Sequence, residues 1–157
     1  MSRRGKVNYF QTSEGAPSPL SITVERQVRY EEVDAIGVVW HGRYVSFLED
    51  GRAGFFERYG LGYLTMHENK MMAPFVQMHI EYIKPLRLSE KFLFTAELFW
   101  SESIRMNFQY RIINQQGAIN ASAYTVQILT DDKFEVQLSR PRLFEEFCEK
   151  WKRGLLS

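Results

Sequence analysis

The sequence lacks most features that would place this protein at a membrane, outside the cell or on nucleic acid. Cys148 is its one cysteine, so no disulfide can form within the chain, and a single thiol suits a reducing cytosol. No apolar run approaches the roughly 18 residues that a membrane span needs, and the N-terminal segment has no apolar core of signal-peptide length. Twenty basic and nineteen acidic residues leave a formal charge of +1 without a basic cluster, which argues against a nucleic acid partner. We therefore expect a cytoplasmic protein with no membrane span.

The common catalytic motifs are also missing. The sequence has no Gly-rich phosphate loop, no serine nucleophile elbow, no paired CxxC ligands and no HExxH. Of its three histidines, His67 lies in a polar loop, and His79 alternates with Gln77 and Glu81 on the less apolar face of a strand. We interpret both as structural, since isolated histidines usually are. The sequence thus predicts no metal site and no cofactor, and few side chains remain that could carry chemistry.

Length and composition predict one compact domain. The chain has 157 residues and is 45% apolar, which is enough for one core and too little for a second domain. Residues 1–19, rich in Ser, Gly and Pro, are predicted to form a flexible leader, and residues 20–157 the domain. Period-two alternation of apolar residues predicts five strands and a short sixth piece, at 21–30, 76–82, 92–100, 104–112, 118–130 and 135–138.

A long amphipathic helix is predicted between the first two strands, at about residues 41–59. The residues of its apolar stripe recur at helical spacing: Tyr44, Phe47, Leu48, Phe55 and Tyr59. Gly51 and Gly54 lie inside this helix, where each costs about 1 kcal/mol relative to Ala. A close contact between the helix and the sheet would explain their presence.

A second helix is predicted from Pro141 onward, with Phe144, Cys148 and Trp151 on one face. The order of strand, long helix and four or five antiparallel strands predicts an α+β domain in which one principal helix lies on a curved sheet. Such a sheet leaves its edges and its other face to be covered, and self-association is the simplest way to cover them.

The segment D-A-I-G-V-V-W-H-G-R-Y, residues 34–44, places a carboxylate directly before the long helix. By position alone, Asp34 would more often cap the helix or stabilise its turn. The segment, however, resembles the signature of hotdog-fold acyl-CoA thioesterases of the 4-hydroxybenzoyl-CoA thioesterase-like family. The strand VERQVRYEEVD, the helical piece FLEDGR and the later IEYIKPLRLSEKF also look like family segments, so the resemblance covers roughly residues 20–130.

The resemblance implies the hotdog fold, in which a long central helix is wrapped by a five- to six-stranded antiparallel sheet. It also implies a homodimer or homotetramer with active sites shared between subunits. The implied function is hydrolysis of an acyl-CoA thioester to the free acid and CoA, with an acyl-carrier protein as a possible alternative carrier of the acyl group.

The resemblance assigns the chemistry to two residues of the segment. Asp34 is the catalytic carboxylate, as attacking group or as base for water, and the backbone N–H of His41 polarises the thioester carbonyl. The physical account agrees, because an aspartate is ionised at neutral pH and a helix N-terminus presents unpaired N–H groups to developing negative charge. A thiol with a pKa of about 8.5 leaves as thiolate without a strong general acid, so these two groups can suffice.

Four further residues of the segment are expected to bind or shape the substrate site. Gly37 and Val39 shape the turn. Trp40 stands where the family pattern has a smaller Tyr or Phe, and it would narrow the acyl pocket. Tyr44 matches the family's aromatic residue, although its helical spacing also places it in the core.

Other charged residues are weaker candidates. Glu49 could be mistaken for the helix carboxylate of some hotdog enzymes, but it more simply forms an i,i+3 pair with Arg52. Lys84, Arg87 and Lys91 lie around the turn after a strand and could meet the phosphates of CoA, although exposed Lys and Arg are ordinary at such places.

Two other functions fit the segment less well. A hotdog hydratase or dehydratase would have an Asp and a His at shorter spacing with an Asn between them, whereas Ala35, Ile36 and Gly37 follow Asp34. A non-catalytic hotdog protein that binds acyl-CoA or acyl-carrier protein would tolerate Asn or Ala at position 34. The sequence therefore favours the thioesterase, while the acyl group and the choice between nucleophile and base stay open.

Overall fold

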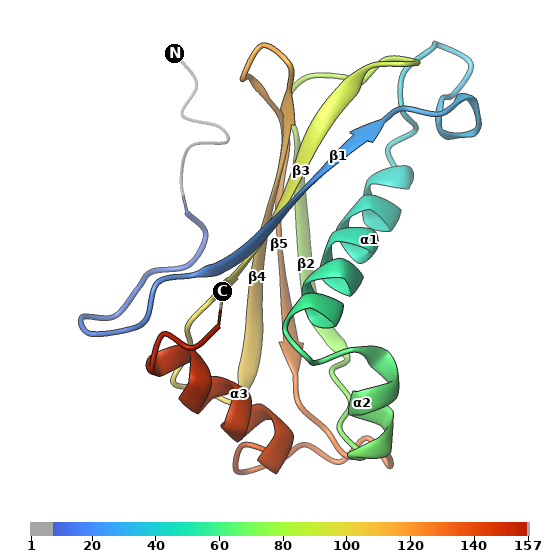
Figure 1. Cartoon of the computed structure of the whole chain (residues 1–157). Coiled ribbons are helices and arrows are strands. Elements are labelled where there is room, and N and C mark those ends of the chain that lie inside the picture. The colour runs from blue at the N-terminus through green and yellow to red at the C-terminus, as the bar shows by residue number, and fades with distance from the viewer. Residues whose placement is uncertain (1–7, 157) are drawn as a thin grey trace.

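The computed structural model describes residues 8–156, which form an α+β domain with one antiparallel sheet. The sheet has five strands in the order β1-β3-β4-β5-β2, and helix α1 lies along one of its faces (Figure 1). The elements are β1 Leu20–Gln27, a 3-10 turn at Tyr30–Glu32, α1 Arg43–Arg58, α2 Tyr63–Glu68, β2 Phe75–Tyr82, β3 Lys91–Phe99, β4 Arg105–Asn114, β5 Ile119–Ile128 and α3 Arg142–Lys152.

The five longer predicted strands are confirmed within a few residues at each end. The sixth, at 135–138, is wrong, since this segment makes only an isolated bridge between Val136 and Thr130. The cause is local, because the Asp131 carboxylate accepts hydrogen bonds from the N–H groups of Lys133 and Glu135, each at 2.9 Å. These bonds fold residues 131–135 into a tight turn, and beyond it the chain pairs back only at the Val136 bridge and at the Gln137 N–H, which donates to the Leu129 carbonyl at 3.0 Å.

The core lies between α1 and the inner face of the sheet. Tyr110 on β4 is flanked by Ala96 on β3 and Ala123 on β5, so two small side chains leave room for one large ring. Phe108 packs edge-on against Phe55 of α1, with ring centroids 5.0 Å apart. The apolar stripe predicted for the helix is therefore the face that meets the sheet.

Helix α1 has 16 residues and is shorter than the predicted 41–59, because residues 41 and 42 form a turn before it. The predicted close contact is confirmed at Gly51. A Cβ built there would lie 1.9 Å from Cε1 of Phe94 on β3, so only a glycine lets the helix approach this strand. At Gly54 a Cβ would meet Cδ1 of Ile22 at 3.2 Å, which is a looser contact.

The predicted C-terminal helix is confirmed as α3, and its apolar face is buried. Trp151 packs edge-on against Trp100 with ring centroids 5.1 Å apart, and its indole N–H donates to the Ser18 carbonyl at 2.8 Å. Cys148 is buried on the same face, and burial raises the pKa of its thiol to about 12. This thiol packs in the core and stays protonated at neutral pH.

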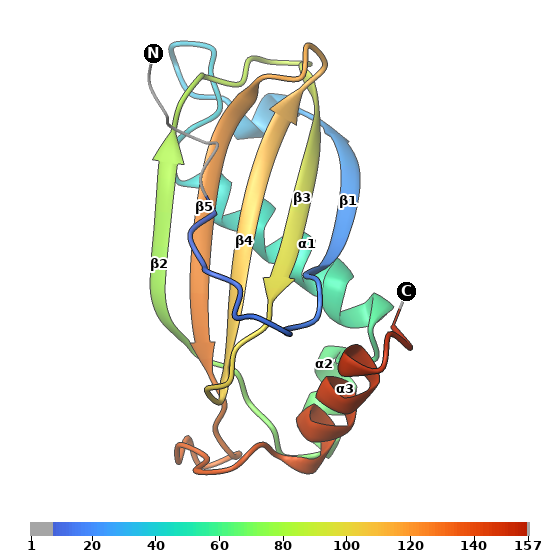
Figure 2. The ribbon, with the colours of Figure 1, turned by 90° about the vertical axis from the view of Figure 1, so that its left-hand side faces the viewer.

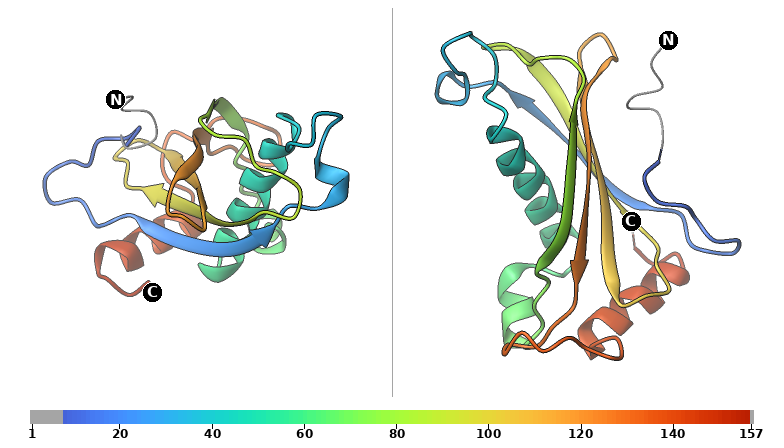
Figure 3. Two further views of the ribbon diagram at one scale, coloured as in Figure 1. Left: turned by 90° about the horizontal axis from the view of Figure 1, so that it is seen from above. Right: turned by 180° about the vertical axis from the view of Figure 1, so that it is seen from behind.

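The chain before β1 crosses the face of the sheet opposite to α1 (Figures 2 and 3). The Tyr9 N–H donates to Oε1 of Gln109 at 2.8 Å, its hydroxyl is 2.7 Å from that of Ser122, and the Phe10 ring contacts those of Phe99 and Tyr124. Residues 8–19 thus have no helix or strand, yet side chains hold them to the sheet. Residues 1–7 of the expected flexible leader lie outside the described residues, and the division at residue 20 stays a prediction.

Candidate active site

Asp34 begins a tight turn that precedes α1. Its N–H donates to the Val38 carbonyl at 2.9 Å, and its carbonyl accepts the N–H of Gly37 at 3.0 Å. Gly37 has φ +79°, a conformation that other residues adopt only with strain. The carboxylate uses one oxygen for the turn, since Oδ1 accepts the N–H of Ile36 at 2.9 Å. Its other oxygen, Oδ2, has no hydrogen-bond partner among residues 8–156.

The turn is anchored to the segment after β2. The N–H of Val39 donates to the Leu86 carbonyl at 2.8 Å, and Val38 forms a bridge with Arg87. On the other side, the N–H of Trp40 donates to the carbonyl of Glu32 at 2.9 Å. The chain between Asp34 and the helix is therefore held at two points by backbone hydrogen bonds.

The start of α1 presents unpaired donors. The N–H of Arg43 donates to the Trp40 carbonyl at 2.9 Å, whereas the N–H of His41 has no acceptor in the part of the chain that the structure describes. This is the ordinary condition of a helix N-terminus, where the first N–H groups lack partners within the helix. The Trp40 ring covers Gly42, because a Cβ there would lie 2.4 Å from ring atom Cζ3.

Tyr82, the last residue of β2, contacts this helix start from the sheet. Its hydroxyl donates to the His41 carbonyl at 2.9 Å, and its ring packs edge-on against Tyr44 with centroids 4.9 Å apart. This bond accounts for the late start of the helix, since the His41 carbonyl points to β2. Burial raises the pKa of Tyr44 to about 12 and raises that of Tyr82 as well, so both are neutral phenols at pH 7.

Sequence reasoning missed Tyr82, treating it as an ordinary member of an alternating strand. Its contact with His41 joins residues 41 positions apart. The available signal was its place at a strand end inside IEYIKPLRLSEKF, a segment that already resembled the family.

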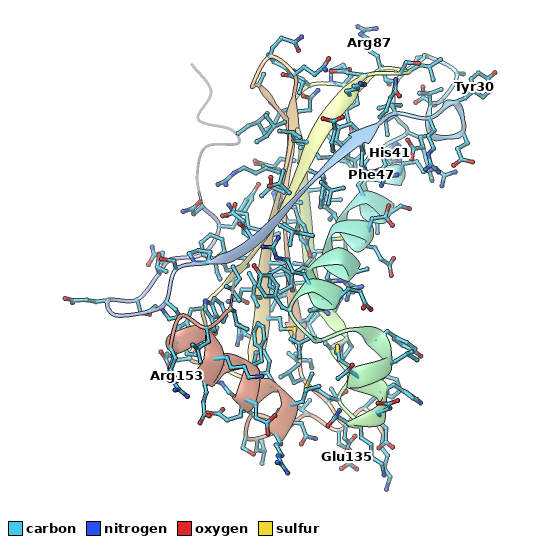
Figure 4. All side chains as sticks on the ribbon, in the orientation of Figure 1. Tyr30, His41, Phe47, Arg87, Glu135 and Arg153 are labelled. Carbon is cyan, nitrogen blue, oxygen red and sulfur yellow. The ribbon has the colours of Figure 1, made fainter. Side chains whose placement is uncertain are left out.

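A cavity of about 350 Å³ opens beside these groups. Its lining is Asp34, Ile36, Val38, Val39, His41, Tyr44, Tyr82, Ile83, Lys84 and Pro85. Four of the six predicted site residues therefore share one cavity. Gly37 and Trp40 do not line it, and the narrowing of the acyl pocket by Trp40 stays a prediction. Figure 4 shows His41 at the beginning of α1, and Arg87 at the same end of the molecule.

A second cavity, of about 300 Å³, lies between α1, α2 and the chain that follows α2. Glu49 and Arg52 line it, and their side chains lie 3.6 Å apart, which confirms the predicted i,i+3 pair. His67 also lines it, while the His79 ring stacks on Tyr124 with centroids 5.4 Å apart. Neither histidine shares a cavity with Asp34.

Residues 8–156 contain neither a metal-binding cluster nor a membrane-spanning helix. No cluster of three or more His, Cys, Asp or Glu residues among them could hold a metal ion. No helix among them is long and apolar enough to cross a bilayer.

The chain is similar to several known proteins. Residues 28–150, more than half of the chain, match the thioesterase-like superfamily. YneP of Bacillus subtilis (strain 168), provisionally named an acyl-CoA thioesterase, is 29% identical over 107 residues, which are 68% of this chain and 78% of YneP. The acyl-CoA thioester hydrolase YbgC of Escherichia coli O157:H7 is 26% identical over 105 residues, 67% of this chain and 78% of that protein.

Among solved structures, a DHNA-CoA thioesterase from Staphylococcus aureus superposes with a TM-score of 0.74 at 23% identity, covering 86% of this chain and 92% of that one. At this identity the likeness shows a shared fold. Together with the match over residues 28–150, it confirms the resemblance that residues 34–44 carry. The chain therefore belongs to the thioesterase-like superfamily of hotdog-fold proteins.

Proposed function

We propose that this protein hydrolyses an acyl-CoA thioester to the free acid and CoA, with Asp34 as the catalytic carboxylate. One observation carries the proposal: Oδ2 of Asp34 and the N–H of His41 have no partner within residues 8–156, and both residues line one cavity at the start of a helix. The names of YneP and YbgC support the same reaction class.

The chemistry follows from the charges at this site. The thioester carbonyl lies with its oxygen toward the N–H of His41, where the positive end of α1 stabilises the negative charge that develops on it. Asp34 either removes a proton from the attacking water, which gives the acid directly, or attacks the carbonyl carbon itself and forms an acyl–Asp34 anhydride, which water hydrolyses to the acid and the free carboxylate once CoA has left. In both routes the C–S bond breaks, and CoA leaves as a thiolate that takes a proton from solvent.

Tyr82 serves as a positioning residue in this proposal. Its hydroxyl holds the carbonyl of the His41–Gly42 peptide, and the Arg43 N–H holds the carbonyl of the Trp40–His41 peptide that carries the donor, so neither peptide group beside the His41 Cα has much freedom to rotate. A donor fixed before the reaction stabilises developing charge better than one that must reorient. Gly37 shapes the turn that begins at Asp34, and Val39 and Tyr44 form part of the cavity wall. The Trp40 ring lies against Gly42 and so covers the start of the helix.

We place a second copy of the chain along β2, giving a homodimer. β2 is an edge strand that pairs only with β5 within the described residues. Four of its large side chains are 39 to 56% exposed, namely Phe75, Val76, Met78 and Tyr82. An exposed apolar edge is usually covered, and pairing with the same strand of a second copy would cover it. The two helices would then lie on the same face of one continuous sheet.

A non-catalytic acyl-CoA binding protein is the alternative. Such a protein needs no carboxylate with a free oxygen beside its ligand, and a turn would be stabilised equally well by Asn. The free Oδ2 therefore favours hydrolysis.

The test is a free-thiol release assay over a panel of acyl-CoA thioesters, with the parent and Asp34→Asn. Asn keeps the oxygen that accepts the Ile36 N–H, so the turn survives while the carboxylate is lost. We expect turnover of at least one thioester by the parent and a kcat lower by about 10²- to 10³-fold in the variant. Asp132→Asn, in the loop before α3, is the matched control and should keep parental activity. Equal activity of parent and Asp34→Asn would remove Asp34 from the chemistry.

A further inference from the structure

The second cavity, between α1 and α2, has no part in the function proposed above. Its volume of about 300 Å³ is at the lower end of the range for pockets that bind small molecules. It shares no lining residue with the cavity beside Asp34, and none of its lining residues belongs to β2. Most of its wall is apolar or aromatic: Ala53, Phe56, Tyr63, Met66, Met71, Met72 and Ala73. Methionine side chains adapt to the shape of an apolar ligand, so this wall suits a small apolar body.

One largely buried cation, Arg52, belongs to this wall. Its side chain is 16% exposed and packs on two aromatic rings, with Cζ 4.4 Å from the ring centroid of Phe75 and 5.6 Å from that of Phe56. Rings on the faces of a guanidinium group stabilise its charge, but they leave the N–H groups, which point outward in its plane, without acceptors. Packing therefore holds the guanidinium group in place and leaves its donors for a ligand.

The donors of Arg52 have no acceptors in the described part of the chain. Its Nε is buried and unpaired, and neither Nη atom donates a hydrogen bond to any of residues 8–156. Glu49 is its ion-pair partner, but Nη2 and Oε1 lie 3.6 Å apart, which is too long for a hydrogen bond. A largely buried guanidinium group without hydrogen bonds is costly. A carboxylate would accept hydrogen bonds from both Nη atoms, in the fork geometry that arginine offers.

The other charged residues of the lining are exposed. Glu49 is 68% exposed, so its side chain can turn to solvent when another carboxylate takes its place. Glu57 is exposed and lies against Gly62, where a Cβ would be 2.5 Å from its Oε1. His67 is exposed as well. Water and salt screen exposed charges, whereas the charge of Arg52 is less screened and dominates inside the cavity.

We propose that the second cavity binds a free carboxylic acid with a small apolar body. The carboxylate accepts hydrogen bonds from Arg52, and the body lies on the apolar wall between α1 and α2. The hydrolysis proposed above releases an acid of this class. The inference goes beyond that reaction, because a monocarboxylic acid that is still esterified carries no negative charge for Arg52.

The test is a titration with hexanoate, and with hexan-1-ol as its neutral analogue, followed by two-dimensional NMR. One variant, Arg52→Gln, removes the guanidinium group, and a second, Glu49→Gln, removes the carboxylate that competes for it. Arg142→Gln and Glu146→Gln are the matched controls. This pair on α3 has Nε and Oε1 2.9 Å apart and lies outside the second cavity.

We expect Arg52→Gln to weaken hexanoate binding by about 10-fold, because its charge-assisted hydrogen bonds to the carboxylate are lost. Binding of hexan-1-ol should equal that of the parent. Glu49→Gln should strengthen hexanoate binding by about 3-fold, since Arg52 then has no competing partner, and this exposed substitution leaves the fold intact. Both controls should match the parent. No hexanoate binding by the parent, parental binding in both variants, or equal changes for hexanoate and hexan-1-ol would overturn the inference.

The position of the chemical-shift changes separates this site from the catalytic one. Hexanoate should shift the amide signals of Met66, Met71 and Met72, in the parent and in Asp34→Asn alike. Shifts confined to Asp34 and its neighbours would mean that hexanoate binds as the product of the proposed reaction, and the inference would fail. If Asp34→Asn kept full thioesterase activity while hexanoate bound beside Met71, the proposed function would fail and the acid site would stand.

A dicarboxylic acyl group is the other possible source of a carboxylate for Arg52. Steady-state kinetics with adipoyl-CoA tests it, because the far carboxylate of this acyl group is free. If Arg52→Gln raised KM for adipoyl-CoA and left hexanoate binding at parental strength, Arg52 would bind the substrate and not a free acid. That result would also overturn the inference.

Discussion

Helix α1 begins beside a cavity and continues into the core. Its start has an unpaired backbone donor, whereas its middle is tightly packed against the sheet. At the start, the N–H of His41 has no acceptor within residues 8–156, and a cavity lies next to it. In the middle, Gly51 is so close to Phe94 that a Cβ would not fit. The comparison indicates that packing in the middle holds the helix in place. The His41 N–H at its start is therefore held in one position and is free to donate to a ligand.

The largest change in stability should come from filling the contact in the middle. In Gly51→Ala the new methyl group would overlap the Phe94 ring, so the helix or the ring must move. We expect the free energy of unfolding to fall by about 2 kcal/mol, since overpacking outweighs the better helix propensity of Ala. Denaturant unfolding measures this value, and kcat per folded molecule should stay near the parental one.

Gly54→Ala is the matched control, because Gly54 is exposed and its Cβ would meet only the flexible end of Ile22. This substitution should raise the free energy of unfolding by up to about 1 kcal/mol. If Gly51→Ala and Gly54→Ala changed the free energy of unfolding equally, the claim that α1 is packed more tightly at Gly51 than at Gly54 would be wrong.

The start of the helix should respond in activity and little in stability. In Tyr82→Phe the ring still packs on Tyr44 while the His41 carbonyl loses its donor. We expect kcat to fall about 10-fold with little change in KM, because a loose His41–Gly42 peptide lets the His41 Cα move and leaves the neighbouring His41 N–H less fixed in the transition state. The free energy of unfolding should fall by about 1 kcal/mol or less, the usual value of one such hydrogen bond.

Steady-state kinetics with one acyl-CoA checks this expectation, and Tyr30→Phe is its control. Tyr30 lies near the same end of the molecule, is 82% exposed, and its hydroxyl has no hydrogen bond to any described residue (Figure 4). A Tyr82→Phe enzyme that lost stability but kept parental kcat would show that Tyr82 supports the fold alone.

The same contrast explains what could be predicted from sequence. Strands and helices follow from local periodicity, and the closeness of Asp34 to His41 follows from a spacing of seven residues along the chain. Tyr82 and Arg52 act through contacts with residues far away in sequence, which no local pattern contains. The strand predicted at 135–138 is wrong for a local reason. The Asp131 carboxylate accepts the N–H groups of Lys133 and Glu135 and holds the chain in a turn, although the apolar residues alternate as in a strand.

The smallest expected effect concerns Tyr44, which lines the cavity and is also buried beneath it. Its pKa is raised by burial from the ordinary 10.0 to about 12. In the unfolded chain the phenol loses its proton near pH 10, whereas in the folded protein it keeps it to about pH 12. The stability that depends on this proton is therefore fully present below pH 10 and falls as the pH rises from 10 toward 12.

At pH 11 the loss from Tyr44 should be about 1 kcal/mol. Tyr44→Phe should lower stability at pH 7 through the lost hydroxyl, yet show a shallower decline between pH 10 and 11 than the parent. Other buried phenols and the Cys148 thiol contribute to the decline in both proteins, so the difference between the two slopes isolates Tyr44. If the parent and Tyr44→Phe lost stability equally steeply with pH, the Tyr44 hydroxyl would reach solvent through the cavity. Tyr44 would then belong to the open start of α1 and not to its packed middle.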